Sequence, residues 1–149
     1  MAIIDKNLFR KVEGELYNYQ RNLRELNEAR LDILYGGAER PKAGSMPEGH
    51  VSDPVGEKGR VMAGLWDSEQ GRWIEVIHDT FQMLPRELKM LVKYKYFDGM
   101  RNEETAMRLH ISRSLFYEWR EEVIIRIVLL ATQRDLVTPI RERRENRTA

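Results

Sequence analysis

The stretch that decides the fold, NEETAMRLHISRSLFYEWREEV, occupies residues 102–123. It has the order of features that a helix-turn-helix requires: a small residue where two helices cross, apolar residues that hold them together, and a tight turn. Ala106 is the small residue, Leu109 seals the last turn of the first helix, and Ile111 packs beneath the turn. We therefore predict a helix-turn-helix over residues 102–123.

The second helix of this motif has one apolar face. Ser112 can begin the helix by accepting a hydrogen bond from a backbone N–H two or three residues later. Phe116, Trp119 and Val123 then recur at steps of three and four, which is the spacing of one helix face. The predicted core of the motif comprises Ala106, Leu109, Ile111, Phe116 and Trp119.

The opposite face of the second helix carries side chains suited to DNA. Arg113 can donate two hydrogen bonds to a guanine edge, and Ser114 and Tyr117 can reach bases or phosphates. Glu118 can accept a hydrogen bond from a cytosine amino group. The predicted DNA contacts are Arg101, Arg108, Ser112, Arg113, Ser114, Tyr117, Glu118 and Arg120, with Lys93 and Lys95 as further phosphate contacts. The alternative is a helical hairpin whose polar face only meets water.

The N-terminal third of the chain predicts one long helix over residues 5–34. Its apolar stripe follows a heptad-like spacing: Val12, Leu16, Tyr19, Leu23, Leu26 and Ile33. Such a stripe suits either a dimer-forming coiled coil or a helix packed on its own domain, and both remain open for residues 1–34. Residues 35–56, with three prolines and five glycines, predict a loop or linker.

Helical periodicity returns in residues 57–133, which we interpret as a DNA-binding domain. The capping residues before Pro54 suit a helix start, and an apolar face then runs to Leu84 with a break near Gly71. Further helices are predicted at 85–97, 102–109 and 112–133, and a basic tail at 134–149. Because no strand-like alternation of useful length occurs, the predicted fold class is all-α.

Several motifs resemble the promoter-reading C-terminal domain of bacterial sigma factors. LPRE at 84–87 begins a helix that ends at FDG at 97–99, and NEETA at 102–106 and ISRS at 111–114 follow. The larger match is to phage transcriptional regulators of the RinA/ArpU family, which adds the N-terminal helix, GHVSDP at 49–54 and FYEWR at 116–120. The chain departs from the pattern at His110, where glycine is usual, and in the bulk of Tyr117 and Trp119.

The resemblance implies a long N-terminal helix followed by a sigma-region-4-like helix-turn-helix bundle. It also implies a phage or prophage regulator of transcription, often of late genes, that acts in the bacterial cytoplasm. The implied partners are double-stranded DNA, a second copy of the chain in a homodimer, and host RNA polymerase. Two other functions fit the residues: a small terminase subunit that recognises viral DNA for packaging, and a polymerase adaptor that does not read DNA.

The division of charge along the chain fits a DNA-binding protein and fits equally a chance asymmetry in a helical protein, while other features of the composition point away from other classes. From Leu84 onward the chain has fourteen basic and ten acidic residues, against eleven and fourteen before it, so the C-terminal half is the basic one. The absence of cysteine excludes disulfides and thiolate metal sites, and no signal peptide or membrane segment is expected. His50, His78 and His110 lack a partner at metal-ligand spacing. Since no nucleophile–base set is recognisable, we expect neither cofactor nor enzyme activity.

Overall fold

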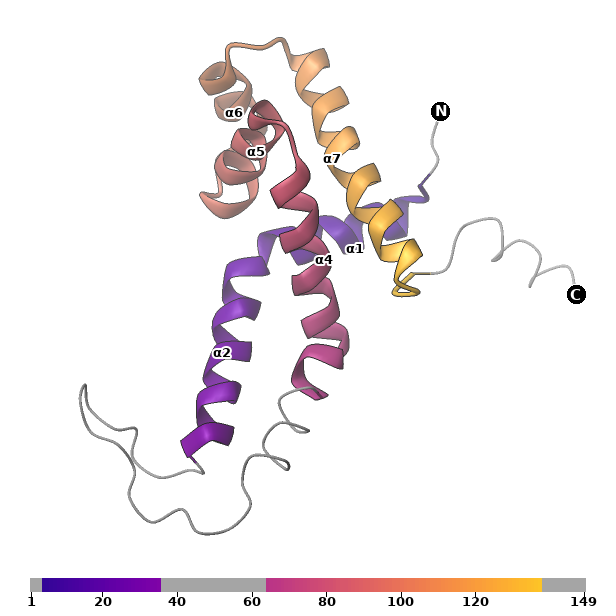
Figure 1. Cartoon of the computed structure of the whole chain (residues 1–149). Helices are drawn as coiled ribbons and strands as arrows, with labels where there is room; N and C mark the ends of the chain where they lie inside the picture. The colour runs from indigo at the N-terminus through magenta and orange to yellow at the C-terminus, as the bar shows by residue number, and fades with distance from the viewer. Residues whose placement is uncertain (1–3, 36–63, 138–149) are drawn as a thin grey trace, which may run out of the picture.

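A computed structural model describes residues 4–35 and 64–137, and every regular element within them is helical. The predicted all-α fold class is confirmed for these residues. The elements are α1 (Lys6–Tyr17), α2 (Tyr19–Tyr35), α4 (Glu69–Met83), α5 (Arg86–Val92), the π-helix η1 (Lys93–Phe97), α6 (Asn102–Leu109) and α7 (Arg113–Gln133) (Figure 1). No helix in the described ranges is both long and apolar enough to cross a membrane. The helix start predicted at 52–54, residues 36–56 of the predicted linker and residues 138–149 of the predicted tail lie outside these ranges.

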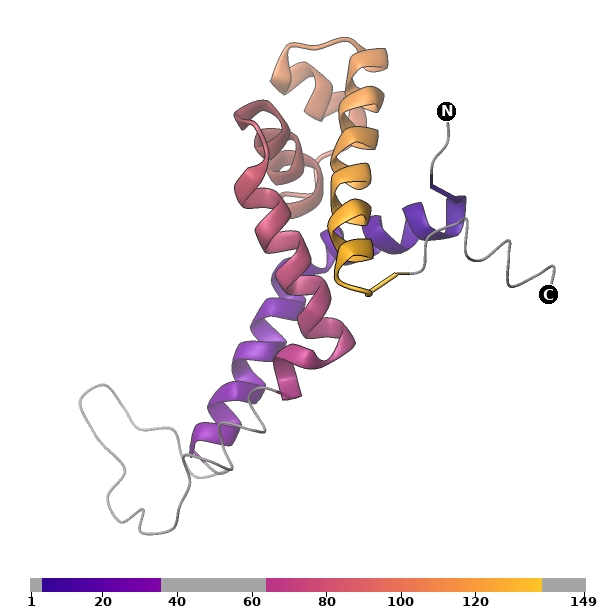
Figure 2. The same cartoon turned by 45° about the vertical axis from the view of Figure 1, so that its right-hand side comes forward.

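The core is built around α7. Five of its side chains are fully buried or nearly so: Phe116, Val123, Ile124, Ile127 and Ala131. They share a cluster with apolar residues of α1, α4 and α5, chiefly Leu8, Val12, Leu16, Trp73, Val76, Ile77, Leu88, Leu91 and Val92. α7 runs beside α4, with α5 and α6 near its N-terminal end and α1 crossing nearer its C-terminal end (Figures 1 and 2). Burying each large aliphatic side chain stabilises such a core by about 1.5–3 kcal/mol.

The single long helix predicted for residues 5–34 is wrong, because the chain breaks at Asn18 into α1 and α2. The Tyr17 ring contacts the Tyr96 ring at 4.8 Å, and the Tyr19 ring stacks on Phe97 at 5.5 Å. Residues two apart in a continuous helix point about 200° apart, so they could not both face the same π-helix. The break allows both tyrosines to pack against η1.

The two N-terminal helices bury three residues of their apolar stripe inside the chain. Val12 and Leu16 of α1 are buried in the cluster around α7, and Leu26 of α2, which packs beside α4, is 3% exposed. Of the two possibilities that the sequence left open, the structure shows packing on the chain's own helices for these three residues. A coiled coil between two copies would have to use other side chains.

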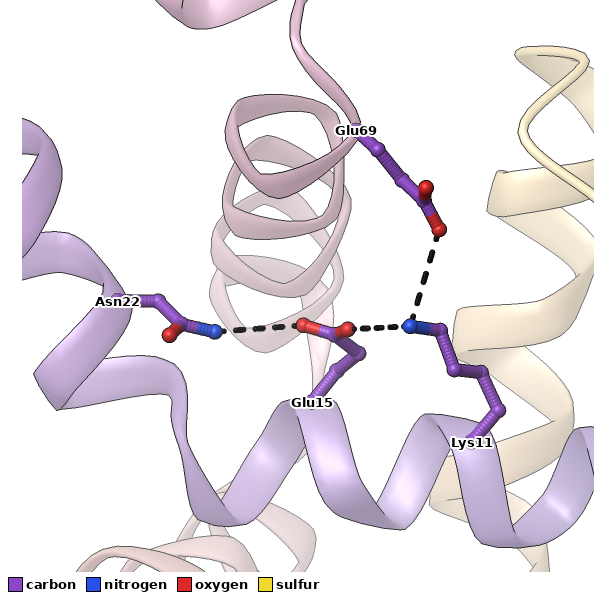
Figure 3. A network of polar contacts seen from close by, with 4 residues as sticks. All are labelled: Lys11, Glu15, Asn22 and Glu69. Atoms are coloured by element: carbon purple, nitrogen blue, oxygen red, sulfur yellow. Dashed lines mark hydrogen bonds and ion pairs between the residues drawn. The ribbon is translucent and has the colours of Figure 1, made fainter.

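A polar network spans the bend between α1 and α2 (Figure 3). Lys11 Nζ lies 2.8 Å from Glu15 Oε1 and 3.7 Å from Glu69 Oε1, and the Asn22 amide donates to Glu15 Oε2 at 3.4 Å. The hydrogen bond and charge of Glu15 raise the pKa of Lys11. Glu15 thus links the helices on either side of Asn18, while Lys11 links α1 to the start of α4.

α4 begins before Gly71, where the sequence predicted a break. The Ser68 hydroxyl accepts from the Gly71 N–H at 3.1 Å, so the break predicted near Gly71 falls at Ser68, three residues earlier. Gly71 is buried against the backbone of the preceding segment: a Cβ added there would lie 2.7 Å from Trp66 Cα. Glycine is therefore required by close backbone approach at this position.

The helix predicted at 85–97 is two elements, because α5 continues into the π-helix η1. The Asp98 N–H donates to the Lys93 carbonyl at 2.8 Å, the five-residue step of a π-turn. Within this wider turn Lys95 and Tyr96 both face the interior, with 5% and 2% exposure. The Tyr96 hydroxyl donates to Glu13 at 2.7 Å, and burial raises the pKa of Tyr96 far above its ordinary value.

Candidate nucleic-acid interface

The turn between α6 and α7 closes with a left-handed residue, His110 (φ 57°, ψ 43°). The His110 N–H donates to the Met107 carbonyl at 3.1 Å, and the Ile111 N–H donates to the Ala106 carbonyl at 3.0 Å. This pair of bonds is the Schellman pattern that ends many helices, and its left-handed position usually holds glycine. His110, which stands where glycine is usual, is therefore the residue of this turn that has positive φ.

Replacing His110 with glycine is expected to raise the free energy of unfolding by about 0.5–1 kcal/mol. The left-handed conformation costs an L-residue about 1–2 kcal/mol, and part of this gain is offset by the extra freedom of an unfolded glycine. His78 is an exposed histidine inside α4, so His78→Gly is the control and should lose about 1 kcal/mol. Urea unfolding measures both variants, and destabilisation by His110→Gly would contradict the assignment of strain to this turn.

The start of α7 agrees with the predicted cap and apolar face. The Ser112 side chain accepts from the Leu115 N–H at 3.1 Å, which begins the helix. Phe116 is fully buried and Ala106 is 8% exposed. The other three predicted core residues are partly buried and pack against the same cluster: Leu109, Ile111 and Trp119. All five side chains thus hold α6 and α7 against the rest of the molecule.

The opposite face of α7 presents the predicted DNA contacts at its N-terminal end. Arg113, Ser114 and Glu118 are exposed there, and Tyr117 is half-buried among them. The Arg113 guanidinium lies over the Tyr117 ring, 5.7 Å from its centre, and its Nη2 atom lies 3.5 Å from the hydroxyl. Arg113 and Tyr117 border a pocket of about 480 Å³ between the N-terminal ends of α6 and α7, which Arg101 and Asn102 also line.

The basic residues of α6 and its cap have partners on the same surface. Arg101 is 80% exposed at its side chain and pairs with Glu104 at 2.8 Å. The Arg108 guanidinium lies over the Tyr94 ring at 5.3 Å. A phosphate that approached Arg101 would compete with the Glu104 carboxylate, so this arginine contributes less attraction than its exposure suggests.

Arg120 is held apart from the exposed set. Its guanidinium lies over the Tyr117 ring at 4.9 Å and over the Phe9 ring of α1 at 5.1 Å. Its Nε atom is buried and has no hydrogen-bond partner among the described residues. Arg120 therefore joins α1 to α7 and meets the candidate interface only beside Tyr117.

The phosphate contact expected from Lys95 is wrong. Lys95 is only 5% exposed, and its Nζ atom lies 2.6 Å from Asn102 Oδ1 and 2.9 Å from the Tyr17 hydroxyl. The π-turn carries this side chain inward. There its Nζ atom also lies over the rings of Tyr17 and Tyr96, 5.4 and 5.1 Å from their centres. Lys93, two residues earlier, is exposed.

The Tyr117 hydroxyl has an unusual polar environment for a surface tyrosine. A hydrogen bond from Arg113, the charge of Arg113 and a hydrogen bond from Asn102 lower its pKa. The same contact with Tyr117 raises the pKa of Arg113. Asn102 was not identified from the sequence as a site residue. Its position as first residue of α6 indicated a helix start, and nothing in the local pattern indicated that Lys95 would approach from beneath.

The remaining histidines give no indication of a metal centre. No group of three potential metal ligands is present in residues 4–35 and 64–137, and His50 lies outside these ranges. Comparison of the chain with protein-family models, with curated proteins and with solved structures finds no match. The candidate function therefore rests on the residues and geometry of the α6–α7 surface.

Proposed function

We propose that this protein binds duplex DNA in a sequence-specific way, with the N-terminal half of α7 as the recognition helix in the major groove. The observation that carries the proposal is the division of α7 into two faces. Phe116 is fully buried against the helices behind it, whereas Arg113, Ser114 and Glu118 are exposed together at the end of the helix. A recognition helix needs this arrangement, because it reads base edges with the first turns while its other face stays anchored.

Within this proposal the protein regulates transcription of phage genes, as its resemblance to the RinA/ArpU family implies, and it acts by binding and not by catalysis. Recruitment of RNA polymerase and occupation of a two-fold operator by a homodimer belong to the same proposal. Since Val12, Leu16 and Leu26 are buried within the chain, the second copy would meet another surface. The symmetry of the bound DNA site tests this point, because a dimer reads two half-sites about 34–36 Å apart.

Replacing Arg113 with alanine is expected to weaken binding to the preferred duplex about ten- to a hundredfold and to relax discrimination at one base pair. The preferred duplex is first selected from a random pool, and affinities are then measured by fluorescence anisotropy. The matched control is Arg126→Ala, which removes the same charge about 20 Å further along α7, where Arg126 pairs with Glu122 at 2.8 Å. We expect this control to bind like the unaltered protein.

Two results would contradict the proposal. The first is no detectable duplex binding at low salt, where phosphate attraction is strongest. The second is equal affinity of the Arg113→Ala variant and the unaltered protein for the selected duplex, which would show that this face of α7 is not the reading face. Assembly into rings of eight or more subunits would favour DNA packaging over transcription as the task.

A further inference from the structure

A polar contact of the buried Lys95 joins η1 to the first residue of α6. The buried Lys95 Nζ atom lies 2.6 Å from Asn102 Oδ1 and 2.9 Å from the Tyr17 hydroxyl. It also lies 5.1 Å from the centre of the Tyr96 ring. A lysine ammonium has three donors and no acceptor, so only the oxygen of the Asn102 amide can face it.

This contact sets the orientation of the Asn102 amide. With Oδ1 turned toward Lys95, the amide can only donate through Nδ2, and Asn102 lines the same pocket as Tyr117, whose pKa it helps to lower. Arg113 Nη2 approaches the same hydroxyl oxygen at 3.5 Å. The Tyr117 oxygen therefore faces two groups that can only donate.

A phenol oxygen that accepts from two donors keeps its own proton for a third partner. The Tyr117 side chain borders the pocket between the ends of α6 and α7, and Arg101 and Arg113 line that pocket as further donors. A hydrogen-bond acceptor, and in particular an oxygen with negative charge, is the complementary group for such a site.

We propose that Lys95 is a positioning residue that, through Asn102, makes the Tyr117 hydroxyl a hydrogen-bond donor toward an acceptor of the duplex. This inference rests on the proposed function for the identity of the ligand, but the arrangement of Lys95, Asn102 and Tyr117 exists in the free protein. A phosphate oxygen and a guanine edge both offer the required acceptor. They differ in sequence dependence, because only the base edge changes with sequence.

The first test replaces Lys95 with methionine, which keeps the length of the side chain and removes its donors. In the free protein the pKa of Tyr117 is then expected to rise, because Asn102 is no longer held as a donor, but to stay below that of an ordinary tyrosine, because Arg113 is the largest cause of its lowering. Tyrosine ring carbons in an NMR titration report this pKa, and Tyr117→Phe identifies the signal. Duplex affinity is expected to fall about five- to tenfold, the effect of one lost hydrogen bond.

The charge control is Lys93→Met, which removes one exposed positive charge from the same π-helix. It should leave the Tyr117 titration unchanged. A second variant, Asn102→Asp, keeps an oxygen for Lys95 but replaces the Nδ2 donor with an acceptor. The Tyr117 hydroxyl must then donate inward, so its pKa is expected to rise and duplex affinity to fall as far as in Tyr117→Phe.

The two readouts separate the failure of this inference from the failure of the proposed function. An unchanged Tyr117 titration in both Lys95→Met and Asn102→Asp overturns the role of Lys95, whether or not the protein binds DNA. A titration that responds as expected in a protein that binds no duplex overturns DNA as the ligand. A loss of affinity that is equal for all sequences supports a phosphate acceptor, and a loss confined to the selected duplex supports a base edge.

Discussion

Replacing Gly71 with alanine is expected to lower the free energy of unfolding by about 3 kcal/mol, which is the upper range for overpacking in a folded interior. A Cβ at this position would lie 2.7 Å from both the Cα and the carbonyl oxygen of Trp66, and both atoms belong to backbone. Backbone cannot move aside as a flexible side chain can, so the segment before α4 would have to separate from the helix. Urea unfolding followed by circular dichroism measures the loss.

The matched control for this prediction is Gly14→Ala. Gly14 lies inside α1, and a Cβ there would meet nothing within 4 Å. The same chemical change should therefore stabilise the protein by about 0.5–1 kcal/mol, because alanine favours a helix over glycine. Equal stability of the Gly71→Ala variant and the unaltered protein would contradict the close backbone approach at the start of α4.

Alkaline pH is expected to remove stability through Tyr96. Burial, and next the charge of Glu13, raise the pKa of this hydroxyl in the folded protein. Below pH 10 the hydroxyl is protonated in both the folded and the unfolded chain, so its contribution to stability is fully present. Above pH 10 the unfolded chain loses this proton and the folded chain retains it. Stability therefore falls, by about 1.4 kcal/mol for each pH unit from this one group.

The measurement compares urea unfolding of the unaltered protein and of Tyr96→Phe between pH 9 and pH 11. The variant lacks the hydrogen bond to Glu13, so its free energy of unfolding is lower by the same amount across this pH range. Above pH 10 its stability should fall less steeply, because one proton fewer is released on unfolding. Glu13→Gln removes the carboxylate charge near Tyr96. Burial still raises the pKa of Tyr96 in this variant, so stability should again fall above pH 10, but over a narrower pH range. If the free energy of unfolding falls with pH equally in Tyr96→Phe and in the unaltered protein, the Tyr96 hydroxyl is not buried in its un-ionised form.

The elements around the turn could be predicted from sequence because their determinants are local. A helix predicted at 102–109 is α6, and the second helix begins beside its predicted cap, Ser112. Capping side chains, apolar spacing and a turn residue act within a few positions of one another, so the sequence contains the whole interaction. The five apolar residues of the motif were identified for the same reason.

The break at Asn18 could not be predicted, because its cause lies elsewhere in the chain. Val12, Leu16 and Leu26 keep a regular spacing that is equally consistent with one helix. The break is explained by Tyr17 and Tyr19, which both pack on the π-helix that follows α5. Neither the π-turn nor its place beside α1 can be inferred from the heptad-like pattern alone.

The exposure of charged side chains was the least predictable part of the candidate site. Lys95 occurs among alternating lysines and tyrosines, and such a run is usually solvated, yet the π-turn buries it. Arg120 is a predicted DNA contact, whereas the rings of Phe9 and Tyr117 hold its guanidinium. In both cases aromatic residues from other elements determine where the charge lies.

The direction of α2 offers a practical route for attaching probes. Beyond the bend at Asn18 this helix runs beside α4 and away from the surface formed by α6 and the start of α7 (Figures 1 and 2). Glu28 is exposed on α2, and the sequence contains no cysteine. A Glu28→Cys variant therefore has a single thiol, through which a fluorophore or a solid support can be attached while the opposite end of the molecule stays open to a ligand.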